Sequence, residues 1–233
     1  RQQRLTYDEI LRVAAGASSL GVSKIRLTGG EPLLDKKICD LVERIVMLPG
    51  IDDLALTTNG MLLSLFAEKL AAAGLHRVTV SLDSIDKDIF RKMSGGRGDL
   101  EKVLAGIKAA EDAGLGPIKI NVVVQKGVND HTVLDLLEYF RGTGTIVRLI
   151  EFMDVGNRNG WQMNQVVPSH VLLESIQRRW AVRPVDRNYT GEVARRYEYV
   201  DGGGEIGFIS SVTEPFCGDC SRARLSADGM LYT

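Results

Sequence analysis

The feature of this sequence that most restricts its fold is a regular alternation of short apolar runs with longer amphipathic runs. The apolar runs are rich in Val, Ile, Leu and Thr, which favour strands, and the runs between them have helical periodicity. The five expected strands are 23–27, 52–58, 76–83, 118–125 and 145–153. Because nearly continuous apolar strands separated by helices are typical of a parallel sheet buried on both faces, the sequence predicts an α/β fold.

The expected helices begin before the first of these strands. Thr6 and Glu9 have the spacing of a capping box, which predicts a helix at the start of the chain. Further helices are expected at 36–48, 62–74, 86–113 and 131–142. Since the chain opens on Arg1 and then on a helix, we expect the first strand of the alternation to be missing.

Beyond about residue 160 the alternation changes. A turn-rich stretch is followed by one more helix, which we expect Ser169 to cap, and then by two strands joined by the Gly-rich turn at 202–204. We therefore divide the chain into a βα domain at 1–160 and a C-terminal α+β extension at 161–233.

Composition excludes several kinds of partner and location. The chain has 29 basic and 30 acidic side chains, so no overall field favours nucleic acid or an anionic membrane. Its 3 cysteines are too few for a disulfide framework and fit a reducing compartment. No apolar run is long enough to span a bilayer and no signal peptide is recognisable, so we predict a cytoplasmic protein.

Polar residues gather where the expected strands end, at 28–32, 57–60, 81–83 and 151–154. Parallel α/β folds place their active sites at the carboxyl ends of the strands, so these segments predict the functional edge. In the first of them, Gly29 and Gly30 would let the backbone approach a ligand closely, although an ordinary βα turn is the simpler interpretation. The spacing matches neither the dinucleotide fingerprint nor the phosphate loop.

Several cations lie in or beside the expected strands. Arg26, Lys119 and Arg148 fall inside apolar runs, where a buried charge is costly unless it has a partner. Each of them alone could snorkel to water, but cations on separate strands predict a bound anion such as a nucleotide phosphate. Arg222 and Arg224 project to one side of an extended chain, where they suit a phosphate or a purine edge, or form a solvated pair.

Cys217 and Cys220 form a C-x-x-C pair just before those two arginines. The spacing fits half of a zinc site, a redox pair or part of an iron–sulfur site. The redox interpretation is less favoured, because the pair lies far from the first strand of a βαβ unit. Cys39 lies in an expected helix beside apolar residues and is interpreted as a small core residue. No side chain has a pattern that assigns it as a general acid or base.

Six segments together resemble one family. They are KIRLTGGEPLL, LTTNGMLL, VSLDS, KINVVVQKGVN, RLIEFMDVGNRNGW and GGGEIGFISSVTEPFCGDCSRARLSADG, in the family's order over essentially the whole chain. The sequence is similar to the molybdenum cofactor biosynthesis protein A family, the GTP 3′,8-cyclases of the radical S-adenosylmethionine superfamily. The last segment is highly specific, whereas TGGEP indicates only the superfamily.

The resemblance implies an incomplete (β/α)6 TIM-like barrel with a C-terminal α+β extension. It also implies two [4Fe-4S] clusters. The first, on a C-x-x-x-C-x-x-C loop, binds S-adenosylmethionine, and the second binds the GTP base, with Cys217 and Cys220 among its ligands. The positions that match S-adenosylmethionine contacts are Gly29, Gly30, Glu31, Ser81 and Met153. The positions that match GTP contacts are Arg26, Thr57, Lys119, Arg148, Arg222, Ala223 and Arg224.

The activity implied by the resemblance is that of a lyase. A radical derived from S-adenosylmethionine removes the hydrogen from C3′ of GTP. C3′ then attacks C8 of the guanine to give 3′,8-cyclo-7,8-dihydro-GTP, the first step of molybdenum cofactor biosynthesis. The implied partners are GTP, an electron donor and a downstream cyclic pyranopterin monophosphate synthase. A homodimer is the expected assembly, and neither nucleic acid nor membrane is an expected partner.

The sequence departs from the family pattern at the cluster ligands. Its 233 residues lack the C-x-x-x-C-x-x-C loop, and the third ligand of the second cluster would be the residue after Thr233. We therefore expect the parent protein to carry both segments and these residues alone to be inactive. Two other hypotheses stay open. One is another radical S-adenosylmethionine enzyme with an auxiliary cluster, modifying a peptide, and the other is a non-enzymatic barrel fragment that binds a purine nucleotide.

Overall fold

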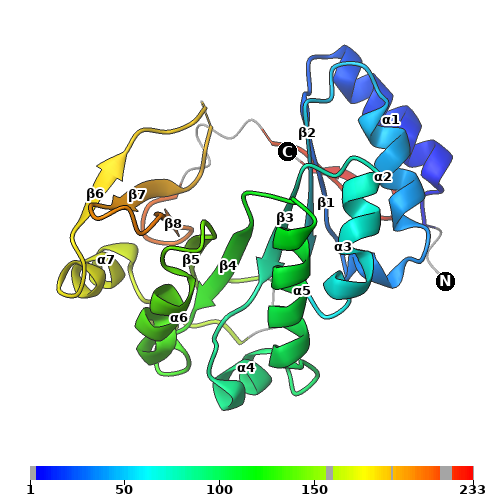
Figure 1. Cartoon of the computed structure of the whole chain (residues 1–233). Helices are drawn as coiled ribbons and strands as arrows, with labels where there is room; N and C mark the ends of the chain where they lie inside the picture. The colour runs from blue at the N-terminus through cyan, green and yellow to red at the C-terminus, as the bar shows by residue number, and fades with distance from the viewer. Residues whose placement is uncertain (1–3, 156–159, 190, 216–221, 233) are drawn as a thin grey trace. The chain divides into compact units, whose positions relative to one another are not determined.

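The computed structural model describes residues 4–155, 160–189, 191–215 and 222–232. The chain forms two compact units, whose helices and strands are labelled in Figure 1. The first unit combines Arg1–Val80, Glu101–Ile118 and Ser221–Thr233, and the second combines Ser81–Leu100 and Lys119–Cys220. The boundary predicted between residues 160 and 161 from the change in the βα alternation stays a prediction.

The first unit contains a parallel sheet of three consecutive strands. They are β1 Lys24–Leu27, β2 Asp53–Thr58 and β3 Arg77–Ser81. The central strand β2 pairs with β1, where Leu56 lies opposite Leu27, and with β3, where Thr57 lies opposite Thr79. The apolar runs thus correctly predicted both the positions and the parallel direction of these strands.

The helices of the first unit are α1 Tyr7–Ser19, α2 Ile38–Val46, α3 Leu63–Ala72 and α5 Leu100–Asp112, with a 3₁₀ turn at Pro32–Leu34. The predicted capping box at the start of α1 is confirmed. Thr6 Oγ1 accepts a hydrogen bond from the N–H of Glu9 at 3.3 Å, and Glu9 Oε2 accepts one from the N–H of Thr6 at 2.8 Å. The helix α2 contacts α1, α3 and β2, and so covers one face of the sheet (Figure 1).

The sheet of the first unit has an apolar face and a polar face. Leu54 and Leu56 of β2 are fully buried. Because side chains alternate along a strand, Asp53 and Thr57 project from the opposite face. Arg77 of β3 donates from Nε to Asp53 Oδ1 at 2.7 Å on that face. This ion pair lies at the amino ends of the strands, so it stabilises the end opposite to the predicted site.

Gly106 marks the place where α5 packs against the beginning of α3. A Cβ atom added at Gly106 would lie 2.7 Å from the carbonyl oxygen of Gly60 and 3.0 Å from the Cβ of Leu63. Glycine therefore permits a backbone approach that any larger residue would prevent.

Gly106→Ala is expected to lower the free energy of unfolding by about 1–3 kcal/mol, because strain outweighs the gain of about 1 kcal/mol in helix propensity. Gly16 of α1 is the matched control, since a Cβ added there would meet nothing within 4 Å. Gly16→Ala is expected to raise the same free energy by about 0.5–1 kcal/mol. Urea unfolding measures both changes, and a shift of the same sign in both variants would contradict the packing argument.

The second unit contains a mixed sheet in the order β4-β5-β8-β7-β6. Its strands are β4 Lys119–Val124, β5 Ile146–Glu151, β6 Val182–Val185, β7 Arg195–Tyr199 and β8 Glu205–Ile209. Strands β4, β5 and β8 are parallel, whereas β7 is antiparallel to both β8 and β6. The helices are α4 Lys87–Met93, α6 Val133–Phe140 and α7 Ser169–Gln177, with 3₁₀ turns at Asp130–Thr132 and Met163–Gln165.

Strands β7 and β8 confirm the predicted pair of strands joined by a Gly-rich turn, in which Gly202 and Gly204 have positive φ angles. Strand β6 was not predicted, because its short sequence contains a proline, which is more typical of a turn than of a strand within a sheet. The prediction that Ser169 caps α7 is wrong. Pro168 occupies the cap position, and Ser169 is the first helical residue, whose hydroxyl donates to Glu151.

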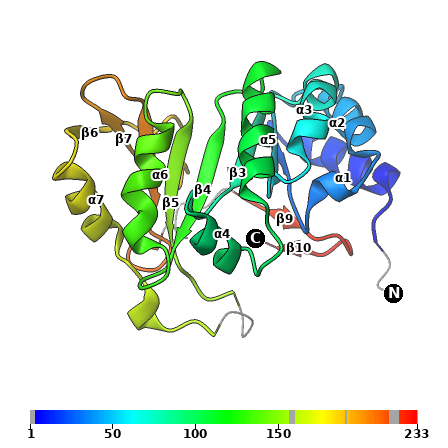
Figure 2. The same cartoon turned by 60° about the horizontal axis from the view of Figure 1, so that its bottom comes forward.

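The last described residues form a small hairpin that belongs to the first unit. Its strands are β9 Arg224–Leu225 and β10 Leu231–Tyr232, paired antiparallel (Figure 2). The N–H of Leu5 donates to the carbonyl oxygen of Ala227 at 2.8 Å, so the hairpin lies against the residues that precede α1.

Among the helices that the structure describes, none combines the length and the apolar character needed to cross a membrane.

Candidate functional site

Two of the predicted GTP contacts lie on the polar face of the first unit. Arg26 of β1 is exposed, and Thr57 near the carboxyl end of β2 is half-buried. The Oγ1 atom of Thr57 is buried and has no hydrogen-bond partner among the described residues. A buried hydroxyl without a partner is costly, so this atom suits a position at which a ligand supplies the missing bond.

The GGEP turn after β1 has an open side. Gly29 has a φ angle of 143°, which favours glycine, and a Cβ added at Gly29 or Gly30 would meet nothing within 4 Å. The backbone of this turn is therefore accessible to a ligand, as the predicted contacts with S-adenosylmethionine require.

Glu31, the acidic residue of the same turn, binds the neighbouring loop. Its Oε1 accepts hydrogen bonds from Thr58 Oγ1 at 2.7 Å and from the N–H of Leu33 at 3.1 Å, while its Oε2 accepts from the N–H of Asn59 at 2.7 Å. The carboxylate thus fixes the turn against the end of β2. A contact between Glu31 and S-adenosylmethionine stays a prediction.

Two further predicted cations lie in the second unit. Lys119 begins β4 and is half-buried, and Arg148 of β5 is only 8% exposed. Gly207 lies opposite Arg148 in β8, and a Cβ added at Gly207 would lie 3.0 Å from Arg148 Cγ. The glycine therefore provides the space through which the arginine side chain passes.

Asn121 is a candidate that the sequence reasoning missed. It lies opposite Arg148 in the parallel pairing of β4 and β5, two residues after Lys119 and on the same face of β4. Its Oδ1 atom is buried and has no hydrogen-bond partner among the described residues. The available signal was an amide side chain in the middle of an otherwise apolar strand.

The predicted S-adenosylmethionine contacts of the second unit lie at the end of a strand or shortly after it. Ser81 ends β3 and is exposed, and Met153 follows β5 and is also exposed. Asp83 holds the segment after Ser81, since its Oδ1 accepts from the N–H of Val123 at 2.8 Å and its carbonyl oxygen accepts from Asn129 Nδ2 at 2.8 Å. Burial raises the pKa of Asp83 to about 6, although the bond from Val123 acts in the opposite direction.

The raised pKa of Asp83 predicts that the contribution of this residue to stability falls as the pH rises. The folded state binds this proton more tightly than the unfolded chain, whose carboxyl pKa is 3.8, so the contribution of Asp83 to the free energy of unfolding decreases between about pH 4 and about pH 6. Asp83→Asn keeps a carbonyl acceptor for Val123 and removes the charge. It is expected to abolish this decrease and to stabilise the protein by about 1–3 kcal/mol at about pH 8. Urea unfolding across this pH range tests it, and the same pH dependence in both proteins would sink the prediction.

The arginine pair and the cysteines belong to the C-terminal part of the chain. Arg222 and Ala223 are exposed and precede β9, whose first residue is Arg224. Cys217 and Cys220 lie outside the described residues. The first unit therefore contains the arginine pair together with Arg26 and Thr57, while Lys119, Arg148, Ser81 and Met153 belong to the second.

Cys39 lies on α2 and is half-buried with a free thiol. Burial raises the pKa of this thiol, which disfavours the thiolate form that binds metals. In the part of the chain that the structure describes, no group of three or more His, Cys, Asp or Glu side chains could hold a metal ion.

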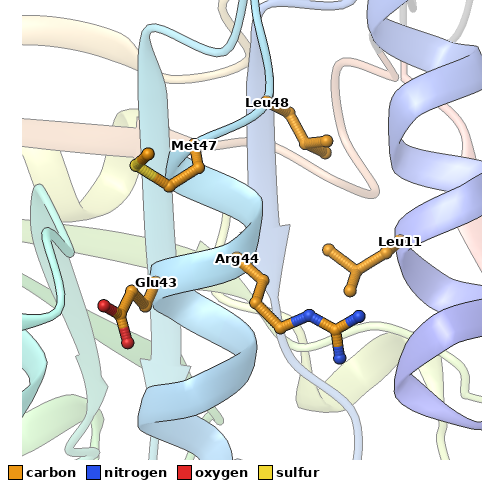
Figure 3. A pocket seen from close by; sticks show the side chains of 5 residues that line it. All are labelled: Leu11, Glu43, Arg44, Met47 and Leu48. Atoms are coloured by element: carbon orange, nitrogen blue, oxygen red, sulfur yellow. The ribbon is translucent and has the colours of Figure 1, made fainter.

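A shallow pocket of about 460 Å³ lies between α1 and α2 of the first unit (Figure 3). It is lined by Leu11, Glu43, Arg44, Met47 and Leu48. Arg44 is held by Asp8, whose Oδ1 accepts from its Nη2 at 2.6 Å. The pocket lies in the helical layer and contains none of the predicted site residues.

Comparison with known proteins gives two family matches that together span nearly the whole chain. Residues 1–140 match the model of the radical SAM superfamily, and residues 145–233 match the model named molybdenum cofactor synthesis C. The chain is 56% identical over 231 residues to a GTP 3′,8-cyclase of Xanthomonas campestris pv. campestris, covering 99% of this chain and 68% of the relative. It is 50% identical over 233 residues to the GTP 3′,8-cyclase of Acidothermus cellulolyticus, covering 100% of this chain and 64% of the relative.

A solved structure is similar in fold although its sequence is distant. The crystal structure of Streptococcus suis SuiB bound to S-adenosylmethionine superposes with a TM-score of 0.63 at 18% identity, covering 76% of this chain and 41% of that one. This likeness confirms the predicted fold class, an α/β chain of the partial TIM-barrel type. The chain spans about two thirds of the length of the relatives and less than half of this structure.

Proposed function

Because the chain belongs to the GTP 3′,8-cyclase family of the radical SAM superfamily, we propose that it converts GTP to 3′,8-cyclo-7,8-dihydro-GTP in the first step of molybdenum cofactor biosynthesis. The observation that carries this proposal is the 56% identity over 231 residues, which includes the C-terminal segment as well as the βα region. That continuity favours the cyclase over a peptide-modifying radical enzyme and over a simple nucleotide-binding fragment.

The proposed activity requires S-adenosylmethionine and iron–sulfur chemistry. When bound, S-adenosylmethionine and its reduced [4Fe-4S] cluster supply the organic radical that removes a ribose hydrogen from GTP. The open side of the turn at Gly29 and Gly30 supports the binding of the methionine part of this cofactor. A second cluster held by Cys217 and Cys220 is a further part of the proposal.

The protein itself binds and orients GTP in this proposal. A triphosphate carries about four negative charges, and its removal from water requires several cationic partners. The residues proposed for this task are Arg26, Lys119, Arg148, Arg222 and Arg224, with Thr57 and Ala223 as further contacts. The buried Oγ1 of Thr57, which has no partner among the described residues, supports a polar contact with the nucleotide. Holding the ribose close to the radical source, with water excluded, is the chain's contribution to the rate.

The partners proposed for the whole protein are an electron donor, a downstream cyclic pyranopterin monophosphate synthase and a second copy in a homodimer. The chemistry requires the first of them, since cleavage of S-adenosylmethionine consumes an electron.

Isotope transfer in the full-length protein tests the proposed reaction. After anaerobic reconstitution with iron and sulfide, GTP that carries deuterium at C3′ is expected to give 5′-deoxyadenosine enriched by one deuterium, together with the cyclised nucleotide. Mass spectrometry measures both products, and ATP labelled at the same position is the control substrate. If 5′-deoxyadenosine forms without deuterium from the labelled GTP, the proposed hydrogen abstraction is wrong.

A further inference from the structure

Asn129, in the turn that leads from β4 to α6, is fully buried and uses its whole side chain in hydrogen bonds. Its Nδ2 donates to the carbonyl oxygens of Asp83 at 2.8 Å and of Val123 at 2.9 Å. Its Oδ1 accepts from the N–H of Gln125 at 2.8 Å. Since a side-chain amide has two N–H donors, both of them are occupied. Asn129 therefore joins the segment after β3 to the end of β4.

Both backbone polar groups of Val123 bond to side chains of this region. Its N–H donates to Asp83 Oδ1 at 2.8 Å, and its carbonyl oxygen accepts from Asn129. Just before this point the N–H of Leu82 donates to the carbonyl oxygen of Asn121 at 3.0 Å, a backbone bond between the two strands. In a regular parallel ladder the groups of Val123 would also bond to backbone. The carboxyl and the amide take those places, so the chain leaves the sheet after Leu82 but stays attached to it.

Ser84 and Thr132 make a second connection between the same two segments. Their Oγ atoms lie 2.9 Å apart, and Thr132 Oγ1 donates to the carbonyl oxygen of Asn129 at 2.9 Å. Ser84 Oγ also accepts at 3.0 Å from the N–H of Asp86, the residue that caps α4. Both hydroxyl residues are buried. These four residues are called the polar cluster: Asp83, Ser84, Asn129 and Thr132.

The place of the polar cluster indicates what it serves. Ser81, two residues before Asp83, ends β3 at the carboxyl edge, where parallel α/β folds bind their ligands. The side chain of Ser81 is exposed, so the backbone around it, and not packing, determines where its hydroxyl lies. Buried polar groups that are all satisfied specify one arrangement of the chain, whereas apolar residues of similar shape stabilise a fold equally well. The cluster therefore serves the exact path of the chain beside Ser81.

We propose that Asn129 and Asp83 are positioning residues, whose bonds to Val123 and to each other fix the chain after β3 and so hold the hydroxyl of Ser81 in place for its contact with S-adenosylmethionine. The inference rests on the proposed function, specifically on Ser81 as a contact of S-adenosylmethionine. In it, neither Asn129 nor Asp83 touches the ligand.

Asp83→Ala in the full-length protein tests the inference. The change removes the acceptor of the Val123 N–H, so hydrogen exchange of the amides at 81–86 and at Val123 is expected to accelerate by about tenfold or more before any cofactor is added. After anaerobic reconstitution, the Kd for S-adenosylmethionine is expected to rise by about tenfold, because binding must then order the released segment. The Kd for GTP is expected to change by less than about twofold. Equilibrium dialysis measures both constants.

Two further variants grade the effect. Asp83→Asn keeps an oxygen that accepts from Val123, so its affinity for S-adenosylmethionine is expected to stay within about twofold of the unsubstituted protein. Ser84→Ala removes the bond to Thr132 and is expected to raise the Kd for S-adenosylmethionine by about threefold. This smaller change remains available if Asp83→Ala does not fold.

Glu192→Ala is the matched control. Glu192 belongs to the same unit, is 8% exposed, and its Oε2 accepts from the N–H of Asn188 at 2.7 Å. The control thus removes a buried carboxyl group that accepts from a backbone N–H, as Asp83→Ala does, without changing the polar cluster. It is expected to leave exchange at 81–86 and the affinity for S-adenosylmethionine unchanged.

The outcomes separate this inference from the function on which it rests. If Ser81→Ala leaves the affinity for S-adenosylmethionine unchanged, the predicted contact and this inference fail together. If Ser81→Ala weakens that affinity by about tenfold and Asp83→Ala does not, only the inference fails. Equal losses of affinity for both ligands in Asp83→Ala, with exchange accelerated uniformly over the second unit, would make Asp83 a general stabilising residue and overturn the positioning role. A protein that gives all the expected changes in S-adenosylmethionine binding but does not cyclise GTP would overturn the proposed function and leave this inference standing.

Discussion

Replacing both Arg222 and Arg224 with Ala is expected to weaken GTP binding by a factor on the order of a hundred or more, with S-adenosylmethionine binding nearly unchanged. Each charge-assisted contact with a phosphate or a purine edge contributes about 1.5–3 kcal/mol, and the double change removes two of them. Both side chains are exposed, so their removal leaves the buried core of the first unit intact. Isothermal titration calorimetry with each ligand measures the two affinities.

The matched control for the arginine pair is the double change of Arg12 and Arg44 to Ala. These arginines lie on α1 and α2 of the same unit, and their side chains are 77% and 50% exposed. The control alters the net charge by the same amount but removes no proposed contact. It is expected to change GTP affinity by less than about twofold at physiological salt, where separated surface charges are screened. An unchanged GTP affinity in the Arg222/Arg224 variant would remove both residues from the site.

Changing either Cys217 or Cys220 to Ser in the full-length protein is expected to abolish cyclisation and to remove about four of about eight irons per chain. A serine hydroxyl does not replace the thiolate that binds iron, and the remaining cysteines cannot hold a [4Fe-4S] cluster with a single open iron. The first cluster should keep its iron. Iron analysis and electron paramagnetic resonance of the reduced protein measure the two clusters separately.

Cys39→Ser is the control for the cysteine changes, because Cys39 is a free, half-buried thiol on α2. It is expected to leave the iron content and the cyclisation unchanged. Retention of all the iron in the Cys217 variant would show that the C-x-x-C pair does not bind a cluster.

Local sequence patterns were sufficient to predict the regular part of the fold. The five apolar runs became β1 to β5, because strands buried between helices need continuous apolar sequence wherever they occur. Strand β6 and the hairpin of β9 and β10 were not predicted. Each of these strands contains four residues or fewer, which is too short for an alternating or continuous apolar pattern to be recognised.

The charged residues of the candidate site could be proposed from the sequence, whereas the hydrogen bonds that support the site could not. Arg148 was recognised because it is a cation in an apolar strand. Asn121 is likewise a polar residue among apolar ones, but it was not selected from the sequence. The hydrogen bonds of Glu151 could not be predicted from the sequence. Its carboxylate bonds to residues 61 and 62 positions away, and only the folded chain determines which donors meet it.

The bond between Leu5 and Ala227 has a consequence for synthesis of the protein. Leu5 binds a residue that is translated much later, near the other end of the described residues, and both belong to one unit. During vectorial synthesis, the second unit can gather its segments while the first still lacks its hairpin. A nascent chain interrupted before residue 221 would thus leave the edge at Leu5 uncovered. The hairpin can therefore join the first unit only after translation has passed that point.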